Sequence, residues 1–297
     1  MVSWKIKRAD IPPRKGKIMG KVLAALAALV LIVAMSGAAE ASANPVVFNS
    51  APDQLPGNMP SLGFQATQTG QFGDAIKLAP GKRVLKSVRV VMSSWACEAG
   101  QWNLGTCHAT PGTTFTEPIT LNIYALGTNG AVGPRIAHRT QTFHIKFRPS
   151  TNATKCPGSP ATAWFSTADQ KCYNGLAQNI WFDFSHQKVR LPTRFVYGIA
   201  YNTSGYGAHP YGYSTTCALD PLTGCPYDAL NVGAAAGLPT RGQDLHPDGV
   251  YQDSATAGNY CDNGAGGTGS FRLDDALNTC NWTGFNPLIQ FRVALPG

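Results

Sequence analysis

Charged side chains are scarce in this chain, and the scarcity narrows its fold class. Asp, Glu, Lys and Arg make up only 13% of the sequence, whereas there are 32 glycines and 21 prolines. Long helices with charged outer faces need more charge and fewer helix-breaking residues. After position 43, no window of a dozen residues keeps helical apolar spacing without an interrupting Gly or Pro. The composition argues against a helical body and favours short elements joined by turns.

Long hydrophobic runs are also missing, apart from one near the N-terminus. This run, Val22 to Met35, has 14 residues and is shorter than the roughly 20 that a membrane-spanning helix needs. Seven Lys and Arg residues precede it and Ala41-Ser42-Ala43 follows, which is the order of a secretory signal. We expect residues 1–43 to be a signal peptide cleaved after Ala43 and the protein to be secreted. An uncleaved N-terminal membrane anchor is the alternative.

Removal of the signal changes the charge of the protein. Residues 44–297 contain 17 bases and 14 acids, a net charge of +3, whereas the whole chain carries +8. The densest remaining bases are Lys82, Arg83, Lys86 and Arg89, a pattern typical of a turn and the outer face of a strand. We therefore expect no nucleic-acid partner, and no membrane partner after cleavage.

All eight cysteines follow the signal, and an even number in an exported chain indicates disulfides. They form four couples that are close in sequence, and closing short loops costs the least entropy. The predicted pairs are Cys97–Cys107, Cys156–Cys172, Cys217–Cys225 and Cys261–Cys280. A metal site is the competing interpretation, but no couple has the two-residue spacing of a zinc knuckle and the six histidines are scattered. We expect neither a metal nor a cofactor.

The clearest strand signal is residues 119–125, where Ile119, Leu121, Ile123 and Ala125 share one face. A Gly-rich turn at 127–130 leads to a second alternating run through residues 142–148, so the two segments predict neighbouring antiparallel strands. Similar runs occupy residues 84–93, 179–184, 195–201 and 288–293. Together they predict an all-β fold: one domain, 44–297, built as an antiparallel two-sheet sandwich of jelly-roll or Greek-key type with long disulfide-stapled loops.

One stretch of the chain resembles known proteins. Residues 55–66, LPGNMPSLGFQA, followed by Phe72-Gly73-Asp74 and Met92-Ser93-Ser94-Trp95, resemble a group of uncharacterised secreted β-sandwich proteins of actinobacteria. The similarity covers mainly residues 46–126. It implies an extracellular or cell-envelope protein, and it brings no established activity, so no catalytic residue is carried over.

No catalytic constellation stands out. A glycoside hydrolase needs two carboxyl groups on either side of a bond, and Glu98 and Glu117, the only glutamates after the signal, are expected to be solvated loop residues. Asp183 lies inside an apolar run, but alternation places it with Asn179 and Trp181 on the face that water reaches. No Gly-x-Ser-x-Gly elbow is present. An enzyme is therefore the less favoured interpretation, with a secreted glycan-active hydrolase or lyase as the alternative function.

Aromatic residues in loops are the candidates for binding. They are Trp95 and Trp102, beside the first cysteine couple, and Tyr206, His209, Tyr211 and Tyr213 in a Gly-rich segment. Flat aromatic rings flanked by polar groups suit the apolar faces of sugars or another protein surface. The leading hypothesis is a secreted, non-catalytic protein of the cell exterior that binds a cell-wall or extracellular glycan, or a protein, through these loops.

Overall fold

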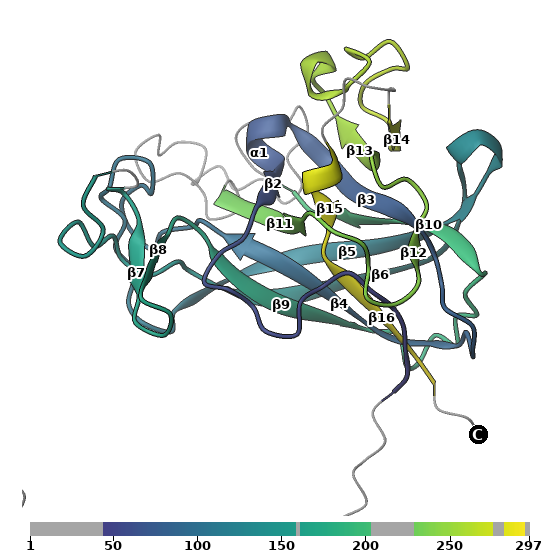
Figure 1. The fold of residues 1–297 in the computed structure, drawn as a ribbon, viewed down its shortest axis with the longest axis horizontal. Helices are drawn as coiled ribbons and strands as arrows, with labels where there is room; N and C mark the ends of the chain where they lie inside the picture. The colour runs from purple at the N-terminus through teal and green to yellow at the C-terminus, as the bar shows by residue number, and fades with distance from the viewer. Residues whose placement is uncertain (1–43, 159–160, 203–228, 276–281, 295–297) are drawn as a thin grey trace, which may run out of the picture. The chain divides into compact units, whose positions relative to one another are not determined.

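The fold comes from a computed structural model that describes residues 44–158, 161–202, 229–275 and 282–294. In this part of the chain nearly all regular structure is β, and the strands form two seven-stranded antiparallel sheets and a small hairpin (Figure 1). The described helices are one α-helical turn, α1 (Phe64–Thr67), and three 3₁₀ turns, η1 (Thr128–Gly130), η3 (Ala257–Asn259) and η4 (Trp282–Gly284). The all-β sandwich predicted from the sequence is confirmed.

The first sheet is built around the long strand β4 (Leu85–Ser94). One edge of β4 pairs with β9 (Leu176–Asp183), and the other edge pairs with β16 (Ile289–Val293) and then with β11 (Leu230–Ala235). The shorter members continue the sheet outward from β16 and β11: β1 (Val46–Asn49), β2 (Ser61–Gly63) and β15 (Asn286–Pro287). Three of these strands, β4, β9 and β16, cover runs that alternation predicted.

The second sheet has the order β14-β13-β3-β10-β5-β6. Its strands are β14 (Arg272–Asp274), β13 (Val250–Ser254), β3 (Thr69–Lys77), β10 (Arg194–Ala200), β5 (Thr114–Leu126) and β6 (Val132–Lys146), with β12 (Gln243–Asp244) pairing beside β13 on β3. The predicted antiparallel neighbours are β5 and β6. Between them, Asn129 and Gly130 have φ values of 55° and 76°, so the turn uses the residues that tolerate this backbone best.

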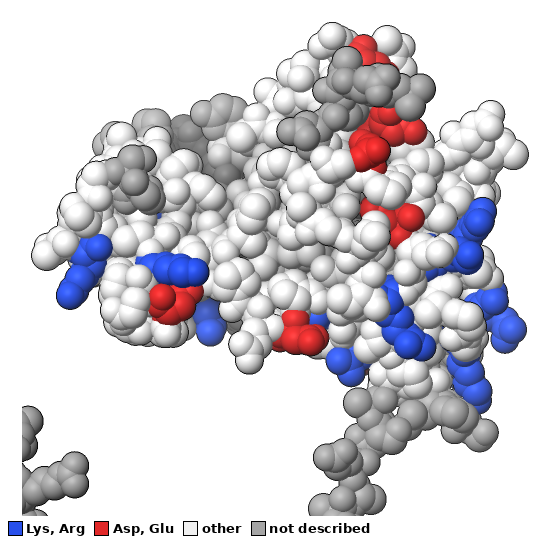
Figure 2. All heavy atoms as spheres, in the orientation of Figure 1, with Lys and Arg blue, Asp and Glu red and all other residues white. Residues whose placement is uncertain are grey.

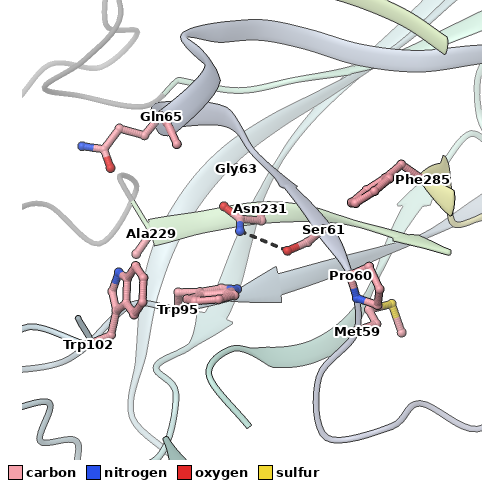
Figure 3. A pocket seen from close by; sticks show the side chains of 11 residues that line it. Met59, Pro60, Ser61, Gly63, Gln65, Trp95, Trp102, Ala229, Asn231 and Phe285 are labelled. Carbon is pink, nitrogen blue, oxygen red and sulfur yellow. Dashed lines mark hydrogen bonds between the residues drawn. The ribbon is translucent and has the colours of Figure 1, made fainter. Parts of the chain in front are cut away.

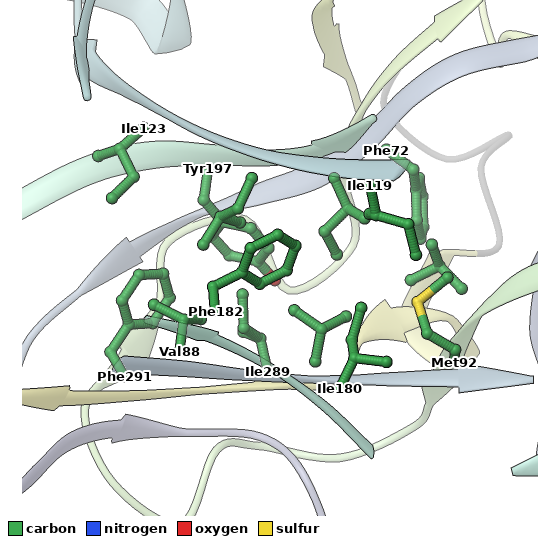
Figure 4. Packing of buried hydrophobic residues seen from close by; sticks show 14 of the residues in the cluster. Phe72, Val88, Met92, Ile119, Ile123, Ile180, Phe182, Tyr197, Ile289 and Phe291 are labelled. Carbon is green, nitrogen blue, oxygen red and sulfur yellow. The ribbon is translucent and has the colours of Figure 1, made fainter. Parts of the chain in front are cut away.

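The core lies between the two sheets (Figure 4). Ile119, Leu121 and Ile123 of β5 are fully buried, as alternation predicted. They face a layer from the first sheet that includes Phe182 of β9 and Phe291 of β16. The Phe291 ring contacts the rings of Phe195 and Tyr197 in β10 at centroid distances of 5.2 and 5.8 Å. These edge-on aromatic contacts join the two sheets across the core.

Two of the predicted disulfides are present in the described residues, Cys97–Cys107 and Cys156–Cys172, with Cα–Cα distances of 5.3 and 5.8 Å. The second one staples the hairpin of β7 (Trp164–Ser166) and β8 (Lys171–Tyr173). Cys261 is also disulfide-bonded. Cys217, Cys225 and Cys280 lie outside the described residues, so the remaining two pairs stay predictions. Bonded cysteines indicate that the protein folds in an oxidising extracellular or periplasmic compartment.

Among the described residues, no helix has the length and apolar content to cross a membrane. The predicted signal peptide, residues 1–43, lies outside the described residues. Its cleavage therefore remains a prediction from the sequence.

Candidate functional site

A pocket of about 440 Å³ opens at one end of the first sheet, where β2 and β11 meet the loop that follows β4 (Figure 3). Two tryptophans, Trp95 and Trp102, lie on one side, and Phe285 lies on the opposite side. Ser61, Gln65 and Asn231 bring hydroxyl and amide groups into it, and its other lining residues are Met59, Pro60, Gly63, Ala66 and Ala229. The lining therefore combines broad aromatic surface with a few neutral polar groups.

Trp95 is placed by the end of β4. Its backbone N–H donates to the Ala229 carbonyl at 2.7 Å, which fixes the residue beside β11. Behind the indole lies Gly175, where a Cβ atom would approach the Trp95 Nε1 to 2.5 Å. The Gly175 carbonyl in turn accepts the indole N–H of Trp164 at 2.7 Å. A residue without a side chain is therefore required for the Trp95 ring to keep this position.

Trp102 comes from the loop closed by the Cys97–Cys107 disulfide. Inside that loop, Ala99 and His108 exchange two backbone hydrogen bonds of 2.9 and 2.8 Å. The Trp102 ring meets Trp95 edge to face, with centroids 4.6 Å apart and planes at 79°. The disulfide and this bridge therefore hold an otherwise irregular loop so that its tryptophan completes the aromatic wall.

The polar wall comes from β2, α1 and β11. Asn231 of β11 donates from its Nδ2 to the Ser61 hydroxyl of β2 at 3.1 Å, the bond dashed in Figure 3. The short helix α1 follows directly, and its first residue, Phe64, is buried against Tyr201 with stacked rings 4.1 Å apart. Phe64 anchors α1 in the core, and the next residue, Gln65, lines the pocket.

The structure brings together Trp95 and Trp102, the two predicted binding residues from the first cysteine couple. Tyr206, His209, Tyr211 and Tyr213 lie outside the described residues, so their predicted role is not resolved. The polar wall and Phe285 were not predicted from the sequence. The nearest signal was the segment 55–66, which carried the resemblance and includes Ser61 and Gln65.

Two of the acids considered as catalytic candidates, Asp183 and Glu98, are exposed in the structure. Asp183 is exposed, together with Asn179 and Trp181, as predicted from the alternation of β9. Hydrogen bonds from Ser185 lower the pKa of Asp183, so it is an ordinary charged surface group. Glu98 is exposed and accepts the backbone N–H of Thr110, which lowers its pKa. Neither residue lines the pocket.

Glu117 corrects a prediction. It was expected to be a solvated loop residue, but it lies inside β5 on the core-facing side and is only 1% exposed. Burial raises the pKa of Glu117 to about 8, although a hydrogen bond from the Asn202 backbone acts in the opposite direction. Its Oε2 has no hydrogen-bond partner in the described part of the chain. A carboxyl group so deeply enclosed cannot reach a substrate in this conformation.

A pair of buried acids lies on the same sheet as Glu117. Asp74 of β3 is 3% exposed, and burial, together with the nearby carboxyl of Asp244 on β12, raises its pKa well above the usual range. Burial also raises the pKa of Asp244. Two such groups share a proton more readily than they hold two charges. Within the described ranges, no cluster of three His, Cys, Asp or Glu side chains could hold a metal ion.

No family model matches the chain, and neither a curated protein nor a solved structure is significantly similar to it. The function must therefore be inferred from the site itself.

Proposed function

We propose that this chain is a secreted, non-catalytic β-sandwich protein of the cell exterior that binds a glycan in the pocket between Trp95, Trp102 and Phe285. The observation that carries the proposal is the composition of the pocket wall: broad aromatic faces beside the amides of Gln65 and Asn231 and the hydroxyl of Ser61. The resemblance of the segment 55–66 to secreted β-sandwich proteins supports the same location.

The chemistry of a sugar ring fits this wall. One face of many pyranose rings exposes only C–H groups, which pack on aromatic faces, while the ring hydroxyls need hydrogen-bond partners at the edges. Amides are suited to those edges because each one offers both donors and an acceptor. A pocket of about 440 Å³ also falls in the usual size range of small-ligand sites.

The described lining of the pocket has no charged side chain, which favours an uncharged ligand. None of the lining residues described for this pocket is Asp, Glu, Lys, Arg or His. An acidic or amino sugar would lose its hydration without gaining an opposite charge, which is costly in a partly enclosed site. Neutral hexoses, or the neutral end of a longer glycan, are therefore the proposed ligands.

The test is binding of the secreted protein to an array of cell-exterior glycans, followed by titration of the strongest neutral ligand. Trp102→Ala should weaken that binding at least tenfold because it removes half of the aromatic wall. Trp181→Ala is the matched control, since Trp181 is an exposed tryptophan of β9 outside the pocket. Failure of every neutral glycan to bind, or equal loss in both variants, would refute the proposal.

The alternative function, a glycan-active hydrolase or lyase, has less support. Asp183, the acid first considered for it, is exposed and keeps a low pKa, and no carboxyl group is among the residues described around the pocket. Incubating the bound glycan with the protein decides between the two. We expect the glycan to be recovered intact, and turnover that Asp183→Asn abolishes would establish the enzyme instead.

A further inference from the structure

A second surface feature lies away from the pocket, at the end of the sandwich where the chain enters its first strand. Two connections meet there, the β3–β4 connection (78–84) and the β9–β10 connection (184–193). Leu85 N–H donates to the Val189 carbonyl and Leu191 N–H donates to the Arg83 carbonyl, both at 2.8 Å. These backbone bonds hold the two connections side by side.

Six bases gather on these connections and on the strand ends beside them. We call this group the basic end: Lys82, Arg83, Lys86, Lys188, Arg190 and Arg194. Residues 78–86 and 184–194 contain no Asp or Glu. The nearest carboxyl along the chain is Asp183, and it already accepts the Ser185 N–H at 2.8 Å. Figure 2 shows several bases along the right and lower edges of the molecule, with further bases at the left, and acids at the top and singly at the lower left and lower centre.

Within the described ranges, no ion pair matches the charges of the basic end. The two ion pairs in the described chain are His246–Asp275 and Arg272–Asp262, and neither includes a member of the basic end. Six like charges held close together repel one another, which lowers the stability of the folded chain. Binding of an external anion would offset this repulsion between the six positive charges.

The basic end lies close to the place where the N-terminal segment joins the sandwich. The Pro45 carbonyl accepts the Val293 N–H at 2.9 Å, and Ala294 N–H donates to the Val84 carbonyl at 2.8 Å, so the first strand starts beside the β3–β4 connection. In the sequence only eight residues, 36–43, separate the apolar run ending at Met35 from the first described residue, Asn44. Eight extended residues span at most about 29 Å. While the apolar run is attached, this end therefore emerges next to the membrane.

We propose that the basic end docks on the anionic headgroups of a phospholipid membrane. The contact is electrostatic, because none of the large hydrophobic residues that are exposed in the described structure lies on either connection. From the sequence, no membrane partner was expected after signal cleavage. That expectation took the bases around Lys82 for a solvated turn and the outer face of a strand, and a solvated basic surface can still attract anionic headgroups. The inference is independent of the proposed glycan site.

The experiment is lysine footprinting of the full chain with vesicles. An amine-reactive reagent labels exposed lysines, and mass spectrometry compares Lys82 and Lys188 with two exposed lysines outside the basic end. These are Lys146, at the end of β6, and Lys171, at the start of β8. Vesicles containing phosphatidylglycerol should reduce labelling of Lys82 and Lys188 several-fold more than that of the other pair. Phosphatidylcholine vesicles should not, and high salt should restore labelling. This readout works whether or not the apolar run also holds the chain on the vesicle.

A pair of matched variants provides the second measurement. Lys82→Glu/Lys188→Glu should lose the vesicle-dependent protection of the neighbouring connection residues in hydrogen exchange, while Lys146→Glu/Lys171→Glu, with the same change in net charge, should keep it. Equal protection of all four lysines in the wild type would overturn the proposal. Protection by soluble polyphosphate but not by anionic vesicles would also overturn it, and would assign the basic end to a free anionic polymer.

Discussion

Glu117 shows how one side chain can make stability depend on pH. Its folded-state pKa of about 8 lies above the ordinary value of 4.5 because the carboxyl is enclosed by the core. Between about pH 5 and 8 the native state therefore keeps a proton that the unfolded state has released. Stability then falls as pH rises through this window, and it is highest at the acidic side. Asp74 and Asp244, whose pKa values are also raised, act in the same direction.

Glu117→Gln tests this link. The amide keeps the shape of the side chain but has no proton to release, so the variant should lose much less unfolding free energy between pH 5 and pH 8 than the wild type. The difference should be a few kcal/mol, since each unit of pKa shift corresponds to about 1.4 kcal/mol. Urea unfolding at both pH values measures it, with Glu98→Gln as an exposed control that keeps the wild-type pH dependence. Identical pH profiles for Glu117→Gln and wild type would show that Glu117 is not the titrating group.

For single residues, the sequence predicted which apolar side chains are buried and which polar ones are exposed, but it did not predict the buried charged side chains. Alternation correctly placed Asp183 in water and Ile119 in the core. It could not predict that Glu117, on the same face as Ile119, or Arg148 would be buried, because patterns assign charged residues to solvent by default. Arg148 is tolerated since its guanidinium donates to the Thr162 carbonyl at 2.9 Å, a partner that only the folded loop supplies.

Among the elements, the loop closed by the first disulfide contributes most directly to the candidate site, because it holds Trp102 in the pocket wall. Cys97 and Cys107 close a loop that carries Trp102. Cys156 and Cys172 close a longer loop that supplies no lining residue and reaches the site only through Trp164, which bonds to Gly175 behind Trp95. Both crosslinks should add similar stability, roughly 3 kcal/mol each in the chain-entropy description. Only the first should also position a residue for binding.

Replacing each pair by serine separates the two roles. Cys97→Ser/Cys107→Ser and Cys156→Ser/Cys172→Ser should lower the unfolding free energy by comparable amounts. The first variant alone should speed amide exchange of residues 98–106 in the folded state and weaken binding of the neutral glycan identified on the array. Glycan binding that both variants weaken equally would mean that the disulfide acts through global stability and does not position Trp102.

Strands in which apolar and polar residues alternate were predicted well from the sequence. Strands interrupted by glycine or proline were predicted less well. β3 was not predicted because Gly70 and Gly73 break its pattern, yet Gly73 is required there: a Cβ would lie 1.8 Å from the Tyr197 carbonyl oxygen of β10. The strand signal was recognised from Ile119, but β5 begins at Thr114. Pro118 is tolerated because β10 pairs with β5 only from Thr120 onward, so its missing N–H breaks no ladder on that side.

For the whole molecule, closure of the sandwich along one side depends on side chains. β6 and β9 are edge strands of different sheets, and they are joined by glutamines from both strands and the turn after β9 without a backbone ladder. Gln141 accepts the Asp183 N–H at 2.7 Å and donates to the Trp181 carbonyl at 3.3 Å, while Gln178 accepts the Lys146 N–H at 2.9 Å. These contacts also satisfy backbone groups that an open edge would offer to another chain.

Gln141 should therefore matter more than its partly exposed position suggests. Gln141→Ala removes two bonds between the sheets and should lower the unfolding free energy by about 1–2 kcal/mol, with faster hydrogen exchange at the Asp183 amide. Gln141→Glu keeps the acceptor for that amide and should preserve its protection. Thr142→Ala, on the next and exposed position of β6, should change stability by less than about 0.5 kcal/mol. If Gln141→Ala and Thr142→Ala gave the same unfolding free energy and the same exchange rate at the Asp183 amide, the glutamine hydrogen bonds would be no stronger than bonds to water. Packing between the sheets alone would then hold this side of the sandwich closed.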